Sequence, residues 1–188
     1  MTERISFTPS WLDKAEAPDK PVYFLRLGSV IERDEFDAMM DGRYRAGEVH
    51  RFQLRDIAIA GVRALVDPDD ADALVQLIES EYGGEKLPPA EAAQVKEISD
   101  VLAKHWPDYA AAREIEARRN KLLPTLAFMQ WCDGWENVAD TKGKPLEYAR
   151  TDKGEIPGDV LRRLVPVQLR VVGIESYSLQ FGESDAKN

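Results

Sequence analysis

The residues that most often carry chemistry are scarce in this chain. It has one cysteine, Cys132, and two histidines, His50 and His105, among 188 residues. A single cysteine excludes an internal disulfide and is typical of a reducing compartment. Neither histidine stands at metal-ligand spacing from a cysteine or carboxylate, and Cys132 has no histidine near it in the sequence to activate it. We therefore predict a protein without catalytic residues, bound metal or cofactor.

Long apolar runs are also absent. No stretch approaches the roughly 18 uninterrupted apolar residues of a membrane-spanning helix. The N-terminal segment reads MTERISFTPS and lacks the apolar core of a secretory signal peptide. We expect a cytoplasmic protein with no membrane partner.

Recognisable binding motifs for phosphate and calcium are missing as well. The glycine pairs do not have the spacing of phosphate-binding or dinucleotide-binding loops. Asp67, Asp69, Asp70 and Asp72 resemble a calcium loop. An EF-hand counted from Asp67, however, places Asp72 where glycine is required and Ile78 where the bidentate glutamate belongs. We interpret these acids as the cap and first turn of a helix.

Acidic residues outnumber basic ones, 34 to 25, which gives a formal net charge of −9. This balance argues against binding a nucleic-acid backbone, because lysine and arginine must replace the counterions of the phosphates. A basic or neutral protein partner fits the charge better. Hydrophobic residues make up 44% of the chain, so the composition indicates a folded protein rather than a disordered one.

The periodicity of apolar residues predicts a fold that is mainly α with a small N-terminal β-hairpin (α+β), as a compact bundle of about five to seven helices. We expect one domain over residues 1–182. It divides into a hairpin over 5–27 with its turn between Asp13 and Lys20, a helical core over 29–131, a loop over 132–157 and a C-terminal helical region over 158–182. The loop includes a short strand-like piece from Leu146 to Arg150. Residues 183–188 are expected to be a disordered tail.

Several local signals place helix ends within this scheme. Ser29 and Glu32 have the spacing of a capping box, which predicts a helix from about Val30 to Met40. Further helices are expected over about 50–66, after Asp67, after Pro88 and from Pro107 to Trp131. Pro124 should kink or split the last of these.

Large apolar residues outside the long helices are the candidate partner-binding residues, because aromatic side chains commonly anchor interfaces. Trp11 and Trp135 fall in an expected turn and loop, and the hairpin adds further apolar surface. The predicted partner-binding set is Trp11, Leu12, Tyr23, Phe24 and Trp135. If Tyr23 and Phe24 are buried while Trp11 is exposed, we expect the turn to be the contact and the hairpin to be scaffold.

The overall layout resembles a known family. The segments that carry the resemblance are FTPSWL, APDKPVYFLR, SVIERDEFDAMM, AGEVHRFQLRDIAIAGVRAL and LAKHWPDYAAAREIEARRNKLLPTLAFMQWCDGWENV. Together they are similar to the tail assembly chaperones and related tail-region proteins of long-tailed bacteriophages and prophages, over about Ile5 to Gly182. The resemblance implies a small, mainly helical, non-enzymatic protein of the bacterial host cytoplasm. It also implies binding to the tape-measure protein and tail-tube subunits during assembly, and many members make a longer form by ribosomal frameshifting.

Three alternatives stay open at this point. The chain could be a phage-encoded inhibitor or adaptor that binds a host protein through its acidic surface. It could be a structural tail component that remains in the finished particle. A small enzyme would require His50 or His105 beside a carboxylate in a deep pocket.

Overall fold

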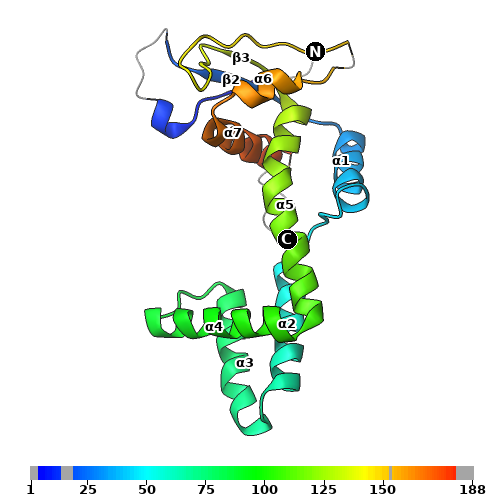
Figure 1. Cartoon of the computed structure of the whole chain (residues 1–188), viewed down its shortest axis with the longest axis vertical. Helices are drawn as coiled ribbons and strands as arrows, with labels where there is room; N and C mark the ends of the chain where they lie inside the picture. The colour runs from blue at the N-terminus through cyan, green and yellow to red at the C-terminus, as the bar shows by residue number, and fades with distance from the viewer. Residues whose placement is uncertain (1–3, 14–18, 153, 181–188) are drawn as a thin grey trace. The chain divides into compact units, whose positions relative to one another are not determined.

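A computed structural model describes residues 4–13, 19–152 and 154–180 (Figure 1). Within these ranges the chain forms seven α-helices, one short 3₁₀ helix and three β-strands. The predicted fold class, mainly α with a small sheet, is confirmed. The expectations for most of the hairpin turn and for the tail over 183–188 fall outside the described residues.

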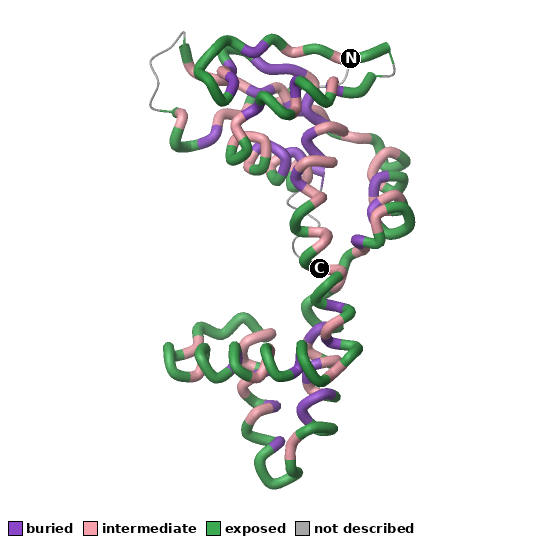
Figure 2. The backbone as a smooth tube through the Cα atoms, in the orientation of Figure 1, coloured by how far each residue is buried: buried purple, intermediate pink, exposed green. Residues whose placement is uncertain are grey.

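The contacts within the chain divide it into two compact units. Unit 1 comprises residues 1–40 and 120–188, and unit 2 comprises residues 41–119. Each unit has its own cluster of buried apolar residues, shown in purple in Figure 2. The length and composition of the chain led us to expect one domain. The spacing of apolar residues within each helix does not show which helices pack into the same core.

Unit 1 contains an antiparallel sheet in the order β1 (Arg4–Phe7), β2 (Val22–Arg26), β3 (Cys132–Glu136). The expected pairing of the two N-terminal strands is confirmed, with Ile5 opposite Leu25. β2 is the central strand, and its buried residues Tyr23 and Leu25 alternate with half-buried ones. This alternation places one face of the strand on the core.

The prediction of a loop over residues 132–157 is wrong for the first residues of that range. Residues 132–136 form β3, which pairs with β2 so that Trp135 lies opposite Tyr23. The expected strand-like piece from Leu146 to Arg150 is irregular backbone instead. Its Leu146 is buried and its N–H bonds to the carbonyl of Val138. A pairing partner more than 100 residues away leaves no local signal, which is why the strand was missed.

Helices α1 (Val30–Gly42), α6 (Gly158–Arg163), α7 (Pro166–Ser178) and the C-terminal part of α5 (Pro107–Trp131) complete unit 1. The capping box predicted for α1 is present: the Glu32 N–H donates to Ser29 Oγ at 3.2 Å, and the Ser29 N–H donates to Glu32 Oε2 at 2.8 Å. Phe36 of α1 packs against Trp131 of α5, with ring centroids 4.6 Å apart. The cap thus starts a helix whose first buried residue contacts the end of α5.

Pro124 lies inside α5, which continues past it as one helix to Trp131. Of the two expected outcomes, a kink or a split, the continuous helix rules out the split. Proline has no N–H, so the carbonyl of Asn120 loses its helical donor. Arg170 of α7 replaces that donor, with Nη2 3.1 Å from Asn120 O. Gly173 of α7 approaches so closely that a Cβ there would lie 1.8 Å from the carbonyl oxygen of Pro124.

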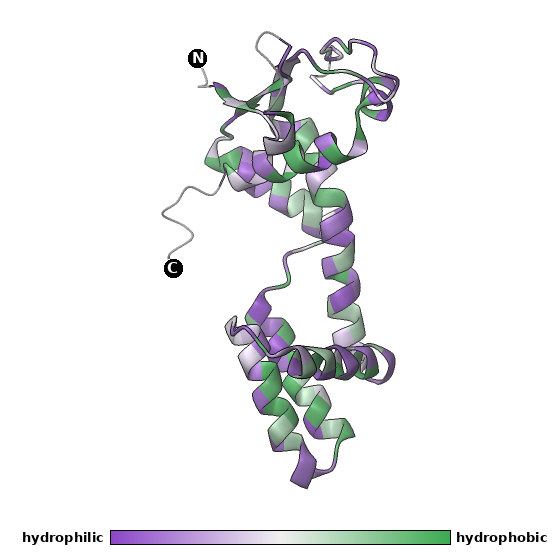
Figure 3. Ribbon diagram, turned by 90° about the vertical axis from the view of Figure 1, so that its left-hand side faces the viewer, coloured by the Kyte–Doolittle hydropathy of each residue, from purple (hydrophilic) through white to green (hydrophobic). Residues whose placement is uncertain are grey.

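Unit 2 consists of α2 (Arg51–Leu65), α3 (Pro68–Gly83), α4 (Pro89–His105) and the N-terminal part of α5. Helices α2 and α3 pack as a pair, and α4 lies across them (Figure 1). Gly61 permits this crossing, because a Cβ there would lie 2.6 Å from Leu102 Cδ2 and 2.9 Å from the Trp106 ring. Apolar and hydrophilic residues both occur along these helices (Figure 3), and the helix positions match those predicted from the sequence.

Candidate partner-binding surfaces

Two of the five predicted partner-binding residues are buried in unit 1. Tyr23 is fully buried and Trp135 is 6% exposed. The Tyr23 hydroxyl donates to Gln168 Oε1 at 2.8 Å, and Trp135 Nε1 donates to the Leu146 carbonyl at 2.7 Å. Both rings pack against Phe128. Trp135 was expected in a loop, and the strand pairing that places it on the core makes it a structural residue.

The other three predicted residues remain near the surface. Trp11 is 45% exposed and lies with half-buried Leu12 on the 3₁₀ helix η1 (Ser10–Leu12). Phe24 is half-buried on β2, opposite Gly134. The condition for assigning the contact to the turn is met for Tyr23, which is buried, and for Trp11, which is exposed, but not for Phe24, which is only half-buried. The η1 segment is therefore one contact candidate, and Phe24 remains another.

Sequence reasoning missed an exposed apolar run at the start of α1. Leu27, Val30 and Ile31 are 41%, 61% and 69% exposed, respectively. The capping box fixes how α1 starts, and the core-facing positions of the helix are Phe36 and Met40. The apolar residues of the first turn therefore face outward, which helical periodicity over so few residues does not reveal.

An apolar groove lies between α2, α3 and α4 in unit 2. It has a volume of about 250 Å³, and its floor includes the buried residues Val62 and Leu102. Leu65 and Val101 on its walls are 44% and 51% exposed. A helix that crosses others steeply contacts them over a short stretch only, which leaves apolar side chains beside the crossing uncovered. The lining residues are Val62, Leu65, Val66, Leu74, Gln94, Glu97, Ile98, Val101 and Leu102.

One of the three helices that border this groove, α3, is acidic. Glu97 is the one charged residue among those that line the groove. Helix α3 carries Asp69, Asp70, Asp72, Glu79 and Glu81 and has neither lysine nor arginine. The acids of its first turn complement the positive end of the helix dipole. The groove therefore combines an apolar floor with a negative neighbouring helix.

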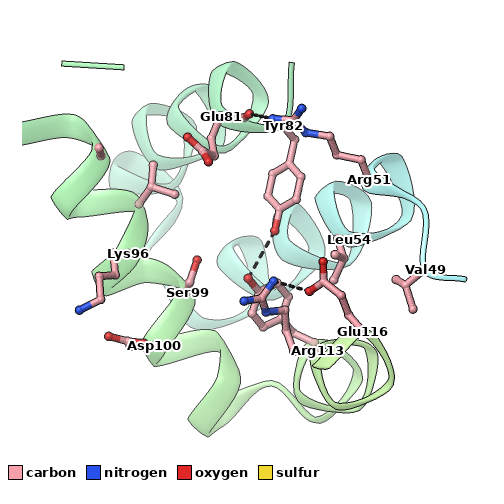
Figure 4. A pocket seen from close by; sticks show the side chains of 13 residues that line it. Val49, Arg51, Leu54, Glu81, Tyr82, Lys96, Ser99, Asp100, Arg113 and Glu116 are labelled. Atoms are coloured by element: carbon pink, nitrogen blue, oxygen red, sulfur yellow. Dashed lines mark hydrogen bonds and ion pairs between the residues drawn. The ribbon is translucent and has the colours of Figure 1, made fainter. Parts of the chain in front are cut away.

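A larger cleft of about 620 Å³ lies elsewhere in unit 2, lined by residues of α2 to α5 (Figure 4). The Tyr82 and Tyr109 hydroxyls are 3.4 Å apart within it. Burial, together with this hydrogen bond, raises the pKa of Tyr82 above its ordinary value. Arg51 donates to the Glu81 carbonyl, and Arg113 pairs with Glu116. Among the described residues, the lining of this cleft includes three basic and three acidic side chains together with Ser99, and neither histidine nor cysteine.

The residues considered for chemistry are not placed for it. Burial raises the pKa of the Cys132 thiol to about 12, so it stays protonated and unreactive near neutral pH. His50 lies 3.4 Å from Glu48 on the surface, and His105 is exposed. Among the described residues, no group of three or more histidine, cysteine and acidic side chains is arranged to hold a metal ion.

Comparison with known proteins adds no assignment: no family model, curated protein or solved structure matches the chain. Across the described part of the chain, no helix is long and apolar enough to cross a membrane.

Proposed function

We propose that the chain is a non-enzymatic phage tail assembly protein that, like the chaperones it resembles, binds the tape-measure protein and tail-tube subunits. The observation that carries the proposal is the apolar groove between α2, α3 and α4. Binding proteins of this kind need an uncovered apolar surface and no reactive group. The groove and the placement of the histidines and Cys132 both fit that requirement.

The occupant that fits the groove is a cationic amphipathic helix of the client. Such a helix presents apolar side chains at i, i+3, i+4 and i+7 to a groove of this kind. A volume of about 250 Å³ accepts one or two large apolar side chains. Lysine or arginine on the flank of the client helix would pair with Glu97 in the lining of the groove. The charge of this surface therefore favours a basic client segment.

Substitution inside the groove tests this assignment. Val101→Asp places a carboxylate on the groove wall, and a bound helix would remove the hydration water of that carboxylate. We expect binding to a co-purified tape-measure protein to weaken more than about tenfold, since burial of one valine-sized side chain contributes about 1.5 kcal/mol or more. The measurement is the dissociation constant by calorimetry, after capture of the complex from co-expressing cells.

A matched control comes from unit 1. Val167 on α7 is 53% exposed, against 51% for Val101, so Val167→Asp makes the same change at equal exposure outside the groove. It should leave binding unchanged. Equal loss in both variants would reject the groove as the client site, and no capture of tape-measure or tail-tube protein by the wild type would reject the function itself.

The η1 segment provides a second candidate contact, and Trp11→Ala separates it from the groove. Trp135→Ala is unsuited to this purpose because that ring is buried. Mass spectrometry of purified virions distinguishes a chaperone, which leaves the particle, from a structural tail component, which stays. Salt-sensitive capture of a host protein in place of tail proteins would favour the inhibitor or adaptor alternative.

A further inference from the structure

One cavity of unit 1 has an unusual charge for so acidic a protein. It lies between α5, α6 and α7, has a volume of about 340 Å³ and is lined by the basic residues Lys121, Arg162 and Arg170. Among the residues that the structure describes, no acidic one lines it. The two cavities of unit 2 described above each include at least one carboxylate, although the chain as a whole carries nine more acidic than basic residues.

No carboxylate in the described part of the chain pairs with the three cations of this cavity. Arg4, Arg26, Arg150 and Arg163 of unit 1 each lie within 4.0 Å of an aspartate or glutamate oxygen. Among the described residues, none of the three cavity cations forms such an ion pair. Their full charge is therefore available to a ligand.

One of the cations is also held in place. Arg170 donates one Nη2 hydrogen to the Asn120 carbonyl that Pro124 leaves without a helical donor. This bond fixes the guanidinium at the cavity while its other N–H groups remain available, so less side-chain entropy is lost when a ligand binds. Thr125 contributes a hydroxyl to the same lining. Pro166, the first residue of α7, brings the positive end of that helix dipole to the cavity.

The rest of the lining is apolar. Pro124, Leu161, Leu164, Pro166 and Leu169 form it. Lysine and arginine have donors and no acceptors, so the charged part of the cavity favours a ligand that accepts hydrogen bonds and carries negative charge. Guanidinium groups match phosphate oxygens with paired hydrogen bonds.

We propose that this cavity binds a small phosphomonoester, with its phosphate on Lys121, Arg162 and Arg170 and its organic part against the leucine and proline side chains. None of these residues lines the groove of unit 2, so the proposal stands or falls independently of the client-binding function.

Calorimetric titration of the full chain with phenyl phosphate tests the proposal, at an ionic strength held constant with chloride. We expect saturable binding that is tighter than that of inorganic phosphate, because only the ester reaches the apolar wall. Lys121→Gln and Arg162→Gln should each raise the dissociation constant about tenfold, as expected when one charge-assisted hydrogen bond is lost. Affinity should also fall as the pH drops below about 6, where the phosphate loses its second charge.

Lys142→Gln is the matched control, because Lys142 is exposed in unit 1 and does not line the cavity. It should leave the affinity unchanged. Absence of saturable binding, or an equal effect of all three substitutions, would overturn the site. Equal affinity for phenyl phosphate and inorganic phosphate would overturn the assignment of an ester. Circular dichroism of each variant verifies that it is folded before it is titrated.

Discussion

At the scale of single residues, the close approach of α7 to α5 in unit 1 depends on a glycine. Gly173 on α7 faces the backbone of α5 at Pro124, where a backbone carbonyl rather than a flexible side chain limits the space. A backbone group in a helix cannot move aside without displacing the whole helix. The contact therefore fixes how closely α7 approaches α5.

Gly173→Ala tests this contact. The added Cβ would lie 1.8 Å from the Pro124 carbonyl oxygen, so we expect the free energy of unfolding to fall by about 3 kcal/mol, the upper part of the usual range for overpacking. Gly42→Ala is the control, because a Cβ at Gly42 at the end of α1 meets no atom within 4 Å. Urea denaturation measures both. A Gly173→Ala variant as stable as the control would show that the two helices separate freely.

At the scale of elements, the start of α1 is joined to the end of β2 through Glu32. This side chain accepts from the Ser29 N–H and from Arg26 Nη2, each at 2.8 Å. The hydrogen bond from Arg26 is the main cause that lowers the pKa of Glu32 to about 2, and the Ser29 N–H adds to it. The ionised carboxylate therefore links the strand to the helix cap.

A pH-dependent loss of stability follows from this link. Because the folded-state pKa of Glu32 lies below the unfolded value of 4.5, its contribution is complete above pH 4.5 and is lost as the pH falls toward 2. Glu32→Gln should cost about 0.5–1 kcal/mol at pH 7, since water screens this partly exposed pair. The difference between variant and wild type should shrink steadily across that acidic range.

Glu35→Gln on the same helix is the control for this pH series. Glu35 is exposed and takes part in none of the hydrogen bonds or ion pairs described for α1. Thermal unfolding at several pH values measures the three proteins. A Glu32→Gln difference that is constant with pH would show that the carboxylate acts through its shape alone.

The elements that the sequence predicted well are those whose signals are local. The Ser29 and Glu32 pair, the acids after Asp67 and the prolines at helix starts placed the helices, because caps and first turns are encoded within a few residues. β3 and the burial of Trp135 were missed, because their partner Tyr23 lies more than 100 residues earlier. The apolar groove was missed for a different reason. It exists only where α4 crosses α2 and α3, which the spacing of apolar residues within one helix does not encode.

At the scale of the whole molecule, the two buried clusters have separate memberships. The cluster of unit 1 includes Tyr23, Phe128 and Leu164, and that of unit 2 includes Leu54, Ile78 and Leu102. Cooperative unfolding follows shared packing, so segments with their own core open as separate units in hydrogen exchange. Whether residues 1–182 form one domain, as the sequence predicts, therefore depends on whether the two units unfold together.

A reciprocal pair of core truncations tests that question by hydrogen exchange with mass spectrometry. Ile78 and Leu164 are each 2% exposed, in unit 2 and unit 1, respectively. Each substitution to alanine should cost about 2–5 kcal/mol. If the units open separately, Ile78→Ala should accelerate exchange in α2, α3 and α4 and leave the sheet and α7 protected, whereas Leu164→Ala should do the reverse. Helix α5 contributes to both units and is left out of the comparison. Acceleration throughout the chain in both variants would show a single cooperative domain, because neither core then opens without the other.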